Sequence, residues 1–144
     1  MTWRWAKGRQ RQSGQALVEV ALVLPLLLLL VAGVMTVGAI GQTDAALLAV
    51  VQEAARAGAV ADSPAAATSQ GLARGTAVAA GYGLDTAPSA LHLVVDAGSF
   101  QRGGRVWAEA AYTVPLTTLP LFGQQRVVLH HRHAEPVDPW RNIP

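Results

Sequence analysis

Residues 14–41 read GQALVEVALVLPLLLLLVAGVMTVGAIG, and no charged side chain occurs between Val20 and Gly41. A helix of these 22 residues, at about 1.5 Å per residue, is about 33 Å long, which is enough to cross a hydrocarbon layer about 30 Å thick. The polar residues Gln42, Thr43 and Asp44 end the apolar run. The sequence therefore predicts one membrane-spanning helix near the N-terminus.

The charges on either side of this run predict its orientation. Four basic residues precede Gly14 with no acidic residue among them, and removing them from the 11 basic residues leaves 7 against 9 acidic residues. Because basic residues collect on the cytoplasmic side, we expect the N-terminus in the cytoplasm and the rest of the chain outside. The later arginines are scattered, so the sequence does not indicate a nucleic-acid partner.

Two alternatives to a retained membrane helix remain open. The segment could be the buried core helix of a soluble domain, although a chain of 144 residues can hardly surround it. It could also be a secretory signal, because Val37-Gly38-Ala39 has small residues at the offsets that signal peptidase requires. The apolar run is longer than the 7–15 residues or so of a signal core.

The sequence around Gly14 resembles a prepilin processing site. The stretch RQSGQALVE, followed at once by the apolar run, is similar to TadE-like pseudopilins of the tight-adherence (Flp-type) pilus system. The Ala/Arg-rich stretch of residues 52–59 and the ending of the chain are similar too. In contrast to the small fibre-forming pilins, Val20 follows the glutamate where they commonly have an aromatic residue, and the chain is much longer.

The resemblance implies a processing event and a set of partners. A membrane-embedded prepilin peptidase would cut after Gly14, which makes Gln15 the first and Glu19 the fifth residue of the mature chain. The protein would then sit in the bacterial inner membrane and help assemble an adhesive pilus with other pilin or pseudopilin subunits and the assembly machinery. No enzymatic activity is expected of the chain itself, which is the substrate of an enzyme.

The position of Glu19 also has a physical meaning that does not depend on the family. A carboxylate within a membrane helix costs on the order of 2–3 kcal/mol, and less near the interface. Cleavage after Gly14 would create an ammonium group at Gln15, which is largely protonated at neutral pH because such a group has a pKa of roughly 7.7–8. Pairing between that ammonium and Glu19 on adjacent helices would set the register of helix packing. Pro25, six residues later, predicts a tolerated or functional kink.

The residues after the apolar run predict a small α+β domain. Buried positions at helical spacing, including Leu47, Val51 and Ala54, predict that the helix continues, with a possible Glu53–Arg56 pair on its surface. Alternation of apolar and polar residues predicts strands, and short Gly-containing turns favour an antiparallel meander, with the second helix covering one sheet face. The expected parts are a leader (1–14), a transmembrane and assembly helix (15–41), an outer domain (42–135) and a Pro-rich tail (136–144). Within the domain we expect helices over 42–61 and 65–80, strands over 91–96, 105–114 and 126–133, and a loop over 115–124.

Candidate chemistry in the outer domain is sparse. The chain has no cysteine, which excludes disulfides, thiolate metal sites and a lipid-modified cysteine. His130, His131 and His133 suggest a metal site, but strand geometry puts His130 on the opposite face from the other two, and only Glu135 lies near them. We therefore expect a polar edge strand with no metal and no cofactor. The alternative function is a signal-anchored envelope binding module, or a secreted domain cleaved near Ala39.

Overall fold

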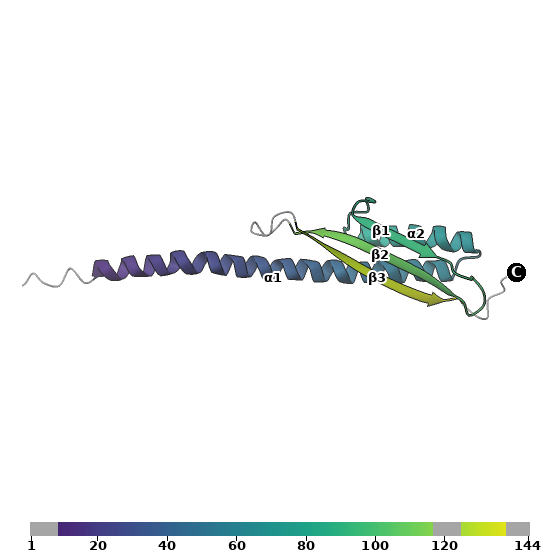
Figure 1. Cartoon of the computed structure of the whole chain (residues 1–144), viewed down its shortest axis with the longest axis horizontal. Helices are drawn as coiled ribbons and strands as arrows, with labels where there is room; N and C mark the ends of the chain where they lie inside the picture. Colours follow the sequence, from purple (N-terminus) through teal and green to yellow (C-terminus); the bar gives the residue numbers. More distant parts are fainter. Residues whose placement is uncertain (1–8, 117–124, 138–144) are drawn as a thin grey trace, which may run out of the picture.

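The computed structural model describes residues 9–116 and 125–137, with side chains from residue 15 onward. Two helices are followed by three strands, which confirms the predicted α+β class (Figure 1). The strands form one antiparallel sheet in the order β1-β2-β3. The elements are α1 (Arg9–Ala59), α2 (Pro64–Gly81), β1 (Leu91–Asp96), β2 (Arg105–Pro115) and β3 (Arg126–Pro136).

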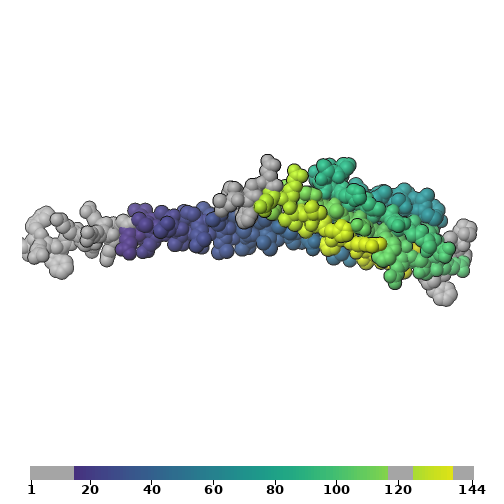
Figure 2. Space-filling view, in the orientation of Figure 1, coloured from purple at the N-terminus to yellow at the C-terminus, as the bar shows by residue number. Residues whose placement is uncertain are grey.

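Helix α1 is the long axis of the molecule. Its 51 residues run without interruption through Pro25 and correspond to a rod of about 77 Å. The helix is long and apolar enough to cross a membrane, and its most apolar part is almost wholly exposed. Figure 2 shows this part as a bare rod that projects from the domain. Because it is not surrounded by the protein, it is not the core helix of a soluble domain.

Small residues let α2 pack closely against the outer half of α1. Ser63 caps α2 by accepting a hydrogen bond from the Ala66 amide, and Pro64 occupies the first turn, as expected from the sequence. A Cβ added at Gly71 would lie 2.9 Å from the Ala54 carbonyl oxygen of α1. The buried side of α1 contains the predicted positions Leu47 and Val51, which are fully buried.

Both helices lie on the same face of the sheet. Helix α1 packs against β2 and β3, whereas α2 packs against β1. The prediction that the second helix covers one sheet face therefore describes only part of this layer. On β2, Val106, Ala108 and Ala110 face the helices and are buried, and the intervening residues point to the open face. The alternation predicted for this strand is confirmed.

Strand β3 is longer than the sequence suggested. It extends to Pro136, three residues beyond the predicted His133, because Ala134, Glu135 and Pro136 pair with the first residues of β2. The Val137 amide then donates to the Gly104 carbonyl at 2.9 Å, and its side chain is fully buried. At the other end of the hairpin, Leu116 donates to Gln125 at 2.9 Å. Most of the expected loop over 115–124, and the tail beyond Val137, lie outside the described residues.

Candidate assembly and processing site

The predicted processing site lies within α1. Gly14 and Gln15 are in its second turn, so the backbone at the predicted cut is helical. The Gln15 side chain donates from Nε2 to Glu19 Oε1 at 3.4 Å, which is the i, i+4 contact expected on one helix face. The structure thus places Gln15 and Glu19 on one face of α1.

Glu19 lies on an unpartnered apolar face of α1. Its neighbours on that face are Val20, Val23, Leu24 and Leu27, which together with Glu19 line a shallow depression of about 260 Å³. All of these residues are exposed, and the outer domain lies farther along the helix. The one carboxylate of the apolar segment is therefore presented on a surface that a second helix could cover.

Pro25 lies inside the continuous helix, one turn and a half beyond Glu19. Proline lacks the amide hydrogen that would bond to the carbonyl of residue 21, so the backbone acceptor of Ala21 loses its usual helical donor. Because six residues separate Pro25 from Glu19, the two side chains point to different sides of the helix. Pro25 is not part of the Glu19 face.

The three histidines of β3 contact three different carboxylates. His130 lies 2.8 Å from Glu109 on the open face of the sheet, and His131 lies 2.8 Å from Asp44 of α1 on the helix-facing side. His133 lies 3.3 Å from Glu135. The opposite orientation of neighbouring histidines agrees with the prediction. Within the part of the chain that the structure describes, no three His, Cys, Asp or Glu residues gather as a metal site would require.

Charged and aromatic side chains interact on the open sheet face. The hydrogen bond from His130 lowers the pKa of the Glu109 carboxyl, and the positive charges nearby act in the same direction. The Arg132 guanidinium lies 4.2 Å from the centre of the Trp107 ring, which is a cation–π contact. These contacts occupy the polar groups with one another and form no arrangement of nucleophile and base.

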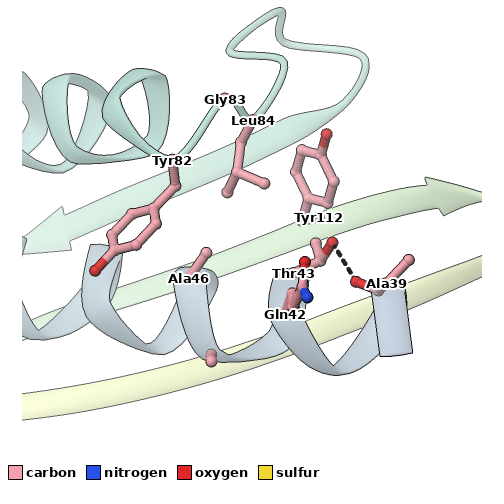
Figure 3. Close-up of a pocket in the computed structure, with 9 residues that line it drawn as sticks. Ala39, Gln42, Thr43, Ala46, Tyr82, Gly83, Leu84 and Tyr112 are labelled. Atoms are coloured by element: carbon pink, nitrogen blue, oxygen red, sulfur yellow. Dashed lines mark hydrogen bonds between the residues drawn. The ribbon is translucent and has the colours of Figure 1, made fainter. Parts of the chain in front are cut away.

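A larger pocket opens where α1 meets the link between α2 and β1 (Figure 3). Its volume is about 570 Å³, and no lining residue is charged at neutral pH. The Tyr112 hydroxyl beside it accepts a hydrogen bond from the Asp85 amide at 3.2 Å, and the Thr43 hydroxyl donates to the Ala39 carbonyl at 3.0 Å. The pocket has a mixed lining, in which small apolar side chains stand beside Gln42, Thr43 and the two tyrosines. Its lining residues are Ala39, Gln42, Thr43, Ala45, Ala46, Tyr82, Gly83, Leu84 and Tyr112.

Comparison with known families bears on the N-terminal part of the chain. Residues 14–56 match the family model described as TadE-like protein. The chain carries a TadE-like domain. The match begins at Gly14 and includes Glu19, Pro25 and the first buried turns of α1 in the outer domain. No curated protein and no solved structure matches the chain.

The TadE-like match ends at residue 56, before Arg74 and Phe100, which help to hold the outer domain together. The sequence offered Arg56 as a possible partner of Glu53, and in the structure the Glu53 carboxylate accepts a hydrogen bond from Arg74 of α2 at 2.7 Å. Phe100 is buried despite its position in the β1–β2 turn, where its φ is +37°. Neither feature has a local sequence signal, because the Glu53–Arg74 pair joins two helices and Phe100 belongs to the core that the helices share with the sheet.

Proposed function

We propose that this protein is a minor pilin or pseudopilin of a tight-adherence pilus, cleaved after Gly14 by a prepilin peptidase. The observation that carries the proposal is the exposed apolar helix of the TadE-like domain, with Glu19 on its bare face one turn after Gln15. The outer α+β domain is fixed to the same helix, so subunits that align their helices also align their domains.

The pairing mechanism follows from the charge of Glu19. A carboxylate enclosed by apolar helices and lipid needs a cationic partner, and the new ammonium of Gln15 on a neighbouring subunit could provide one. Removing one member of such a pair leaves the other charge uncompensated, at a cost of about 3–5 kcal/mol. A helix shifted along its neighbour would lose the pair, so Glu19 favours one register.

Cleavage requires the helix to open locally at Gly14. Proteases act on accessible, extended backbone, and glycine in a helix interior is less favourable than alanine by about 1 kcal/mol. Gly14 also has no side chain to obstruct the peptidase. The position of the glycine in the second turn of α1 is therefore compatible with opening from the nearby helix end.

The first test is the N-terminus and intact mass of the protein from its native membranes. A chain that begins at Gln15, with or without cyclisation of that glutamine, would support prepilin processing. A chain that begins at Met1 would favour the signal-anchored binding module, and one that begins near Ile40 would favour the secreted domain. Either of these results would refute cleavage after Gly14.

The second test addresses Glu19 itself. Glu19→Gln keeps the shape of the side chain and removes its charge, and Glu53→Gln makes the same change on the same helix in the outer domain. We expect Glu19→Gln to abolish pilus assembly and chemical cross-linking between neighbouring subunits, while its insertion into the membrane stays normal. Glu53→Gln should have little effect on any of these. Normal assembly of Glu19→Gln would rule out the pairing mechanism.

A further inference from the structure

The pocket between α1 and the α2–β1 link lies at the outer end of the apolar run. The lining residues that α1 contributes lie between Ala39 and Ala46, and the uncharged run ends among them, at Gly41. They cover about 10 Å along the helix, and the interfacial layer on each side of a bilayer is about 5–8 Å thick. In a membrane crossed by this run, the pocket therefore lies where the hydrocarbon gives way to the lipid headgroups.

Two tyrosines form walls of the pocket beside α1. Figure 3 shows Tyr112 toward the Ala39 end of the helix and Tyr82 beside Ala46, with Leu84 between the two rings. Tyr82 is 61% exposed, so much of its side chain has no cover from the protein itself. Tyrosine is enriched at membrane interfaces, because its ring is apolar and its hydroxyl forms hydrogen bonds with water or headgroups. Both tyrosines therefore suit the depth at which the pocket lies.

The polar groups of the pocket are uncharged, and several of them can donate hydrogen bonds. The Tyr112 hydroxyl accepts from the Asp85 amide at 3.2 Å, so its own O–H is available to donate. Tyr82 adds a second hydroxyl, and Gln42 adds a side-chain NH2 group. These donors stand beside alanine and leucine side chains. The site thus fits a neutral ligand that combines apolar parts with oxygen acceptors.

Charge argues against a site for an anionic headgroup. No cation lines the pocket, and the two aspartates next to lining residues in the sequence have other partners. Asp44 lies 2.8 Å from His131 of β3, and the Asp85 carboxylate accepts from the Ala87 amide at 2.9 Å. The ester carbonyls of a glycerolipid are acceptors without charge, and in a bilayer they lie between the headgroups and the acyl chains. The pocket volume of about 570 Å³ is within the range of small-molecule sites.

We propose that this pocket binds the glycerol-ester region of one phospholipid from the leaflet that faces the outer domain. Tyr82, Tyr112 and Gln42 donate to the ester carbonyls, and the first carbons of an acyl chain lie against Leu84 and the alanines of α1. Because the walls come from α1, the α2–β1 link and β2, a bound lipid would hold the outer domain at one orientation to the membrane. The inference rests on the membrane-anchoring part of the proposed function and is independent of cleavage and of Glu19.

Photo-reactive lipids and two neighbouring substitutions provide the test. Ala39→Phe places a ring in the pocket, whereas Gly38→Phe places it at the same depth outside the lining, where a Cβ meets nothing within 4 Å. The full-length wild type and both variants would be placed in phosphatidylcholine vesicles that contain a phosphatidylcholine analogue with a diazirine next to the ester. A second analogue would have the diazirine at the end of the acyl chain. Mass spectrometry after illumination and digestion would locate the lipid adducts.

We expect the near-ester analogue to label the pocket lining of the wild type and of Gly38→Phe more than the side of α1 that carries Gly38 and Gly41. Ala39→Phe should lose this labelling, while the chain-end analogue labels residues 20–35 equally in all three proteins. Equal labelling of the lining and of the Gly38–Gly41 side would mean random lipid contact and would overturn the site. Labelling of the lining that persists in Ala39→Phe would also overturn it. Failure of the chain-end analogue to label residues 20–35 would instead refute the membrane crossing, and the lipid site with it.

Discussion

The packing of α2 on α1 leads to a prediction of opposite effects for the same substitution at two glycines of one helix. In Gly71→Ala, the new methyl group would lie 2.9 Å from the Ala54 carbonyl oxygen and 2.8 Å from a methyl group of Val95. The carbonyl belongs to the backbone of α1, so the helices must separate. Overpacking of this kind costs about 1–3 kcal/mol, whereas replacing glycine by alanine in a helix gains about 1 kcal/mol. We expect a net loss of up to about 2 kcal/mol in the free energy of unfolding.

Gly81→Ala is the matched control. Gly81 is the last residue of α2, and a Cβ there would have nothing within 4 Å. We expect a neutral effect or a gain of up to about 1 kcal/mol. Urea titration of the full chain in micelles, read by pulse proteolysis of the outer domain, would compare both variants with the wild type. If Gly71→Ala were as stable as Gly81→Ala, the close approach of α1 and α2 would be wrong.

Three further changes test other contacts. Glu53→Gln should destabilise the outer domain by less than about 1 kcal/mol, because the pair with Arg74 is partly exposed. A double-mutant cycle with Arg74→Met would measure the coupling energy between the two side chains. A coupling energy of several kcal/mol would contradict the exposed geometry. Glu109→Gln should reduce stability slightly at neutral pH, since the hydrogen bond from His130 lowers the folded-state pKa of Glu109. The stability that this pair contributes is fully present above the unfolded-state pKa of about 4.3, and it is lost as the pH falls through the lowered folded-state pKa. The melting temperatures of the wild type and of Glu109→Gln should therefore converge in acid. Melting temperatures that moved apart as the pH fell would refute the pair. Val137→Ala should cost about 1.5–3 kcal/mol, because the side chain is fully buried at the end of the sheet, and an unchanged urea midpoint would show that this end is not packed.

Local patterns were sufficient to predict most of the elements. The β1 strand has the predicted bounds because strict alternation stands between turn signals, and α2 begins as predicted because Ser63 and Pro64 form a helix start. Glu19 and Gln15 could be singled out because their meaning depends on spacing along one helix. The α+β class follows from the order of these elements.

Contacts between distant elements were not predictable from local patterns. The extension of β3 to Pro136 depends on pairing with the start of β2, and the sequence Ala134-Glu135-Pro136 alone reads as the end of a strand. The Glu53–Arg74 pair joins two helices, so the nearer Arg56 was the obvious partner in the sequence. The apolar run likewise gives only the length of helix that lipid could cover, and not which part the protein covers itself.

The depth of Glu19 in the bilayer decides how much charge pairing can contribute to assembly. At the inner interface, water and lipid headgroups would screen the carboxylate, and a pair with Gln15 would contribute little. One turn inside the hydrocarbon, an unpaired carboxylate is costly and a partner on the neighbouring subunit is favoured. A large assembly defect in Glu19→Gln should therefore occur together with a position of residue 19 below the headgroups. The same defect with residue 19 at headgroup level would mean that Glu19 acts through a contact other than charge pairing in the bilayer.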